Sequence, residues 1–108
     1  MNNQVFAFEV SVKGTDWTKI INARTAGKAK YQYWLDVTDA WPDVPITAMR
    51  ARKYSSGKPY TSSEFERNAK YRGMPKVKCG QRVKVGNSLG VIVGHNSSAN
   101  FDVLFDDD

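Results

Sequence analysis

The stretch from Arg50 to Lys84 constrains the organisation of this chain more than any other part of the sequence. It holds 11 of the 16 lysines and arginines but only two acidic residues. The sequence before it has the pattern of a compact αβ unit, and the sequence after it has the pattern of short β hairpins. We therefore expect a ββαβ unit over residues 1–54, a basic helical connector over 55–78 and a small β module over 79–108, forming one compact α+β structure.

Apolar and polar residues alternate over 6–12 and again over 17–23, which is the period of half-buried strands. Turn-forming residues at 14–16 separate the two runs, so the sequence predicts a hairpin. Thr25 can accept a hydrogen bond from the first free amides of a helix. The spacing predicts a helix over Ala26–Ala40 that ends before Trp41-Pro42, because the residue before a proline is disfavoured in helical geometry.

The predicted helix has two apolar sides. One side, which we expect to face the sheet, consists of Ala26, Ala29, Tyr33, Val37 and Ala40. Three of these five residues are alanines. The other side carries Tyr31, Trp34 and Leu35. A helix on one small sheet buries one side only, so we expect the C-terminal module, another protomer or a partner to cover the second.

Residues 46–54 predict a third strand. If Met49 and Ala51 face the helix, then Arg50, Arg52 and Tyr54 lie on the opposite face, because successive side chains alternate across a strand. Cations beside an aromatic ring on an open sheet can hold phosphates and stack bases. The same pattern is also typical of an ordinary solvated face.

The residue pattern of the connector predicts a short helix that ends near Tyr71 and is stopped by Gly73 and Pro75. Two registers of a capping box are open, Thr61 with Glu64 and Ser63 with Glu66. Its apolar stripe is limited to Phe65 and Ala69, so the pattern predicts weak docking.

The C-terminal part predicts three short strands with glycine bends, which make up most of a small, strongly bent barrel. The runs Gly80–Val85, Gly90–Gly94 and Phe101–Asp106 resemble the KOW and Tudor-type SH3-like barrels. That resemblance implies an interaction module without chemistry. The family usually has further strands, so either the barrel is incomplete or the N-terminal unit completes it.

The whole chain is also similar to small proteins encoded by bacteriophages and prophages. The block Ala23–Tyr31 carries this likeness, together with Asp36, Asp39, Arg50 and Arg52. No activity comes with this second resemblance.

The sequence favours no catalytic or metal site. One cysteine and one histidine do not supply a zinc site, and no catalytic motif surrounds Cys79, His95, Asp102 or Asp106. The aspartates over 106–108 are typical of a solvated chain end, or could pair with the basic stretch. We expect no enzyme activity and no cofactor. A single cysteine and the lack of a signal or membrane-spanning pattern predict a cytoplasmic protein.

A net charge of +5 that is concentrated in one stretch favours an anionic partner. We therefore predict a non-enzymatic, phage-derived accessory protein that binds DNA or RNA. The residues expected to contact it are Arg50, Arg52, Tyr54, Lys58, Arg67, Lys70, Tyr71, Arg72, Lys76 and Lys78.

The alternative is a protein-binding module, for example a phage inhibitor of a host nucleic-acid-binding or defence complex, in the manner of anti-CRISPR proteins. Tyr31, Trp34 and Leu35 would then form the anchor, because buried aromatic residues dominate protein interfaces. The sequence does not specify the oligomeric state.

Overall fold

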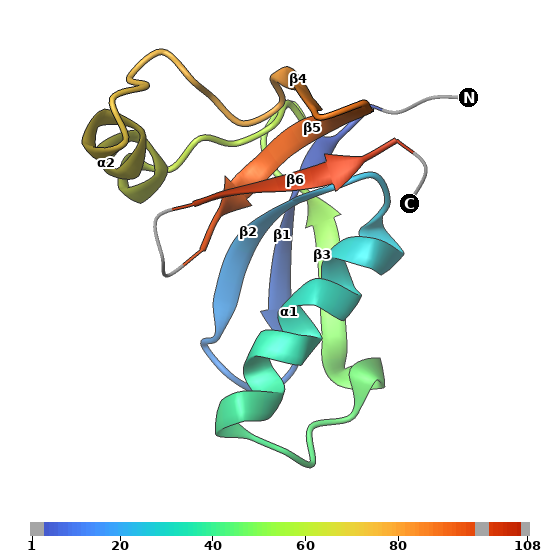
Figure 1. Cartoon of the computed structure of the whole chain (residues 1–108). Coiled ribbons are helices and arrows are strands. Elements are labelled where there is room, and N and C mark those ends of the chain that lie inside the picture. The colour runs from blue at the N-terminus through green and yellow to red at the C-terminus, as the bar shows by residue number, and fades with distance from the viewer. Residues whose placement is uncertain (1–3, 97–99, 107–108) are drawn as a thin grey trace.

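The protein has the predicted α+β architecture, with two three-stranded antiparallel sheets and two α-helices (Figure 1). The structure is a computed structural model that describes residues 4–96 and 100–106. Sheet A has the order β2-β1-β3 and sheet B the order β4-β5-β6. The strands of sheet A are β1 (Phe6–Val12), β2 (Thr18–Ala23) and β3 (Met49–Lys53), and those of sheet B are β4 (Arg82–Val85), β5 (Ser88–His95) and β6 (Phe101–Phe105).

The N-terminal core lies between sheet A and helix α1 (Ala26–Ala40). Phe8, Val10 and Val12 of β1 are buried in it, as the alternating pattern predicts. The bounds of α1 confirm the prediction, and the Thr25 hydroxyl oxygen accepts a hydrogen bond from the Lys28 amide at 3.2 Å. The Thr25 cap and the apolar periodicity of the sequence therefore account for the start of α1 and for the buried face of β1.

Trp34 belongs to the N-terminal core, so its assignment to a separate apolar patch was wrong. Its ring packs against the first core cluster, and Nε1 donates a hydrogen bond to the Val44 carbonyl at 2.9 Å. The segment after the helix folds back against this side of α1, which the helical wheel alone does not predict. Tyr31 and Leu35 remain 51% and 46% exposed.

The third strand begins later than the sequence predicts. Residues Ile46–Ala48 form a 3₁₀ turn, η1, in which the Ala48 amide donates to the Pro45 carbonyl at 3.0 Å. Strand β3 then starts at Met49 and pairs antiparallel with β1. Met49 and Ala51 pack toward the core and Arg50 is exposed on the other side, which confirms the predicted faces.

Helix α2 (Ser63–Tyr71) is capped by Ser62, so neither predicted capping-box register is correct. The Ser62 hydroxyl oxygen accepts from the Phe65 amide at 3.0 Å. A phenylalanine at that third position cannot return the second bond of the box. Gly73, at φ +75°, ends the helix in a left-handed conformation that favours glycine.

The apolar stripe of α2 consists of the two predicted residues, and both are fully buried. Phe65 and Ala69 are 1% and 0% exposed and pack with Val77 and Ile92 into a second core. The Phe65 ring also packs against that of Phe101, at 5.3 Å between ring centres. Val77 of the segment after α2 belongs to this second core, and Cys79 packs against it.

Sheet B has strands close to the predicted positions. Gly90 is required by close approach, because a Cβ atom there would lie 2.6 Å from Val103 Cγ1 and 2.9 Å from the Leu104 carbonyl oxygen. The described part of the N-terminal unit adds no strand to this sheet. If the module is related to a barrel, β1–β3 do not complete it by strand pairing.

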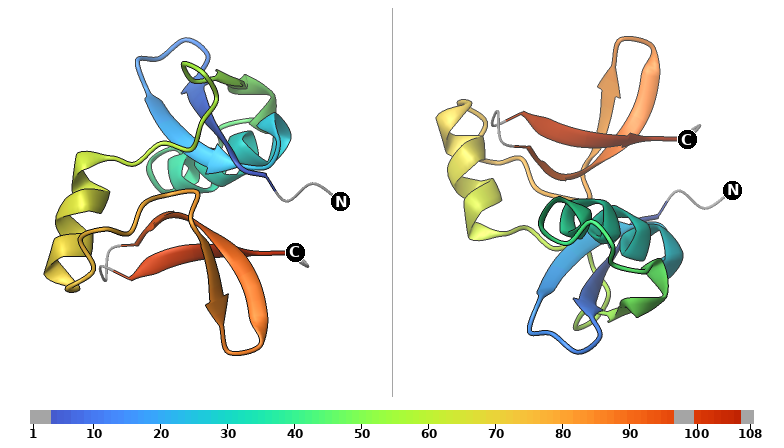
Figure 2. Two further views of the ribbon diagram at one scale, coloured as in Figure 1. Left: turned by 90° about the horizontal axis from the view of Figure 1, so that it is seen from above. Right: turned by 90° about the horizontal axis from the view of Figure 1, so that it is seen from below.

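The two halves are joined by polar side chains at the end of β2. Asn22 is 7% exposed. Its Nδ2 donates to the carbonyls of Tyr60 at 2.8 Å and Val93 at 2.9 Å, and its Oδ1 accepts from the Tyr60 amide at 2.8 Å. Arg24 Nη2 donates to the Phe105 carbonyl at 2.9 Å. Figure 2 shows the resulting arrangement, with the two sheets on either side and α2 at one flank.

Within the described residues, no helix is both long and apolar enough to cross a lipid bilayer.

Candidate nucleic-acid interface

Helix α2 presents a basic face to solvent because its apolar side is fixed in the second core. Phe65 and Ala69 point inward, so Arg67, Lys70 and Tyr71 lie on the exposed sides of the helix. Tyr71 is 80% exposed. The burial of one side thus determines where the charges are displayed.

The segment after α2 carries further exposed cations. Val77 is buried, while Lys76 and Lys78 on either side of it are exposed. At the end of the helix, Arg72 Nη2 donates a hydrogen bond to Asn100 Oδ1 at 2.9 Å. We call the six exposed residues Arg67, Lys70, Tyr71, Arg72, Lys76 and Lys78 the α2 surface.

Five cations of the α2 surface outnumber the two carboxylates of the helix, Glu64 and Glu66, which lie in its first turn. Among the residues that the structure describes, none of these five cations forms an ion pair. Their charge is therefore directed to solvent, where it can attract a polyanion.

Four of the ten predicted contact residues lie apart from the α2 surface. Arg50 and Arg52 are on β3, which lies on the opposite side of Figure 1 from α2, and Lys58 lies close in sequence to Gly57, whose carbonyl accepts from the Ala7 amide. Arg52 donates from Nε and Nη2 to Glu9 Oε1 at 3.0 and 2.7 Å. The Tyr54 ring packs edge-on against Tyr60 at 5.5 Å, so it is already engaged.

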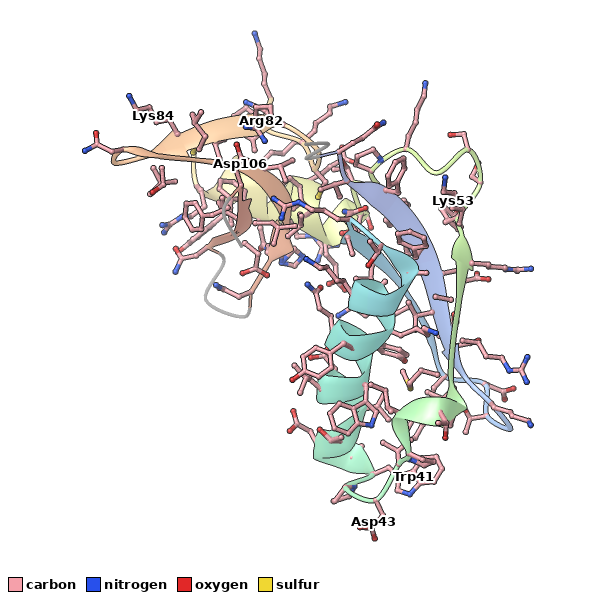
Figure 3. The ribbon with its side chains drawn as sticks, turned by 90° about the vertical axis from the view of Figure 1, so that its right-hand side faces the viewer. Trp41, Asp43, Lys53, Arg82, Lys84 and Asp106 are labelled. Atoms are coloured by element: carbon pink, nitrogen blue, oxygen red, sulfur yellow. The ribbon has the colours of Figure 1, made fainter. Side chains whose placement is uncertain are left out.

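Three other cations of the basic stretch lie outside the predicted contact set. The Lys53 ammonium lies 4.5 Å from the centre of the Phe6 ring. Arg82 Nη1 donates to Asp106 Oδ1 at 2.7 Å, and Figure 3 shows this pair at sheet B, with Lys84 on the same sheet. The hydrogen bond from Arg82 lowers the pKa of Asp106. Asp106 therefore pairs with the basic stretch, while Asp107 and Asp108 lie outside the described residues.

Cys79 and His95, the two side chains considered for catalysis, make contacts within the fold. Burial raises the pKa of the Cys79 thiol to about 11, so the thiol is protonated at neutral pH and is a poor nucleophile. Asn68 Nδ2 lies 2.8 Å from His95 Nδ1, and the His95 ring lies beside Phe65. Among the described residues, no group of three or more His, Cys, Asp or Glu side chains is arranged to hold a metal ion.

The alternative anchor is only partly assembled. Tyr31 and Leu35 are exposed one turn apart on α1, and the Tyr31 ring lies 5.9 Å from that of Trp34. Because Trp34 is held by Val44, this set offers two free side chains rather than three. Sequence reasoning also missed Asn68 and Asn100, which fix His95 and Arg72, since no sequence pattern marks such long-range amide contacts.

No protein-family model, curated protein or solved structure matches this chain.

Proposed function

We propose that this protein binds nucleic acid without catalysing a reaction, and that the α2 surface is the main contact. The observation that carries the proposal is a set of five exposed cations with no ion-pair partner among the described residues, two on a helix anchored by Phe65 and three at its C-terminal end and on the segment that follows. Cations that already stabilise the fold would lose those contacts on binding. The cations of the α2 surface carry no such cost apart from the Arg72 hydrogen bond to Asn100.

The chemistry of the surface favours phosphates over base edges. Lysines and arginines on a short helix can neutralise backbone charge, whereas sequence reading needs several side chains aligned in a groove. Tyr71 offers an exposed ring on which an unpaired base can stack. We therefore expect weak sequence preference and binding to both duplex and single strand. Arg50, Arg52 and Lys58 would take part only where the nucleic acid extends around the molecule.

The biological setting is part of the proposal. From the resemblance described under the sequence analysis, we further propose an accessory protein of phage origin that acts in the bacterial cytoplasm. The competing function, inhibition of a host complex through Tyr31 and Leu35, is supported by the exposure of those two side chains on α1.

A salt series tests the proposal. Affinity for a mixed-sequence duplex and for a single strand is measured by fluorescence anisotropy from about 20 to 200 mM salt. If the α2 surface neutralises three to five phosphates, the plot of log K against log salt concentration for the duplex should have a slope between about −2.7 and −4.5. If the protein binds neither the duplex nor the single strand at the lowest salt concentration, the proposal is rejected. Tight, salt-tolerant binding to one host protein instead would favour the inhibitor.

A further inference from the structure

A groove with a volume of about 630 Å³ runs along strand β2, between the two halves of the molecule. Lys19, Ile20, Ile21 and Asn22 of β2 all line it. Successive side chains of a strand point to opposite faces, so four consecutive lining residues indicate that the groove follows the edge of the strand. Figure 1 shows this edge of β2 turned away from β1, with α2 above it.

This strand edge is open. β2 is an outer strand of sheet A, and β1 is its only partner strand within the part of the chain that the structure describes. Across the described residues, no other backbone hydrogen bond involves residues 18–23. Outward amide and carbonyl groups of an edge strand are a template for a further strand. Asn22 closes one end of the groove through its bonds to Tyr60 and Val93.

The walls of the groove are apolar with acidic groups among them. Leu35 of α1 lies on one side, and Phe65 and Val93 belong to the C-terminal half. Asp36, Glu64 and Asp102 supply three carboxylates. Among the described residues that line the groove, Lys19 is the only lysine or arginine, and it already lies 3.5 Å from Asp36. In a protein with a net charge of +5, this groove is therefore a local acidic site.

We propose that the groove binds an extended segment of a partner protein in which basic and apolar residues alternate, and that this segment adds to sheet A as a strand beside β2. Its backbone would pair with the free edge of β2. One set of its alternate side chains would contact Leu35 and neighbouring apolar groups, and the other set would reach the carboxylates. This site does not depend on the nucleic-acid proposal, since the side chains that carry it differ from those of the α2 surface.

Two other occupants fit the groove less well. Nucleic acid would place its phosphates against Glu64 and Asp102, which repel them. A second copy that pairs through its own β2 would bring the same carboxylates of both copies together, because a two-fold interface repeats each surface. A basic peptide complements the charge instead of repeating it.

Synthetic peptides of about eight residues, blocked at both ends, are long enough to span the edge. An alternating Lys-Val peptide should bind at least about tenfold more tightly than the matching Glu-Val peptide at about 50 mM salt. Two N-methylated forms of the Lys-Val peptide, each methylated on one alternate set of amides, test the strand geometry. Only one set faces β2, so only one of the two forms should lose binding.

Paired protein variants test the charge. Glu64→Gln with Asp102→Asn should weaken binding of the Lys-Val peptide by about threefold to tenfold. Asp39→Asn with Asp43→Asn changes the net charge equally at exposed positions outside the groove and should change affinity by less than about twofold. Equal loss with both methylated peptides, equal binding of the Glu-Val peptide, or self-association of the free protein at about 100 μM in ultracentrifugation would each overturn the proposal.

Discussion

The two halves of the molecule are built from the same parts, a three-stranded antiparallel sheet and one helix, but they differ in how they are held. The N-terminal core cluster contains eight buried residues and a 15-residue helix. The C-terminal cluster contains four buried residues and a nine-residue helix. We infer that the first half is stabilised by its own packing, whereas the second depends on a smaller core around Phe65 and on its polar contacts with the first.

Cations with an ion-pair partner occur in both halves, since Arg82 of sheet B pairs with Asp106. In the N-terminal half, Arg52 pairs with Glu9, Lys19 with Asp36, and Lys53 with the Phe6 ring. The α2 surface of the C-terminal half has no such ion pairs among the described residues. High charge density in a sequence therefore does not by itself identify an interface; the cations without an intramolecular partner are the better candidates.

The largest effect should come from the ring at the centre of the weaker half. Phe65→Ala should cost about 3–5 kcal/mol of unfolding free energy, because it leaves a cavity beneath α2. Amide spectra should show loss of the α2 and sheet B signals while those of sheet A persist. Tyr71→Ala on the same helix is the control and should cost less than about 0.5 kcal/mol. Loss of the amide signals of both sheets together would show that the N-terminal half is not stable independently of the C-terminal half.

A smaller effect should come from the contact between the halves. Asn22→Asp keeps an oxygen for the Tyr60 amide but removes both donated bonds and buries a carboxylate. We expect a loss of about 2–4 kcal/mol and separation of thermal unfolding into two transitions by calorimetry. Asn87→Asp, at an exposed turn position, provides the matched change and should be nearly neutral. A single unaltered transition in Asn22→Asp would contradict the role given to this side chain.

The smallest effect concerns the thiol near this contact. The pKa of Cys79 is raised from 9.0 to about 11, so the folded state favours the protonated thiol. The contribution of this thiol to the free energy of unfolding is therefore fully present below pH 9 and is lost as the pH rises through 11. Alkylation by iodoacetamide should therefore be slow in the folded protein at pH 8, and its rate should rise with a midpoint near pH 11. In urea the midpoint should fall toward 9.0. Equal rates in the folded and unfolded protein would show that the thiol is exposed.

Features set by neighbouring residues could be predicted from the sequence, and features set by distant partners could not. The Thr25 cap and the apolar period gave the bounds of α1, and the glycine bends located the strands of sheet B. Ser62 was missed because several adjacent hydroxyl residues can each cap a helix.

Asn22 was missed because its partners lie 38 and 71 residues away. The basic stretch was recognised as a whole, but its division into paired and unpaired cations depends on where Glu9 and Asp106 lie. The groove beside β2 was not predicted, because it forms only when the two halves meet.

Binding of nucleic acid through the α2 surface is tested most sharply by two variants of equal net charge. Arg67→Ala, Lys70→Ala and Arg72→Ala together remove three cations from the α2 surface, whereas Lys13→Ala, Lys28→Ala and Lys30→Ala remove three from the N-terminal half. In the salt series with duplex DNA, the first variant should reduce the magnitude of the slope by about two to three units, and the second by less than about 0.5. Equal reductions in both variants, or no change in the first while it remains folded, would contradict binding through the α2 surface.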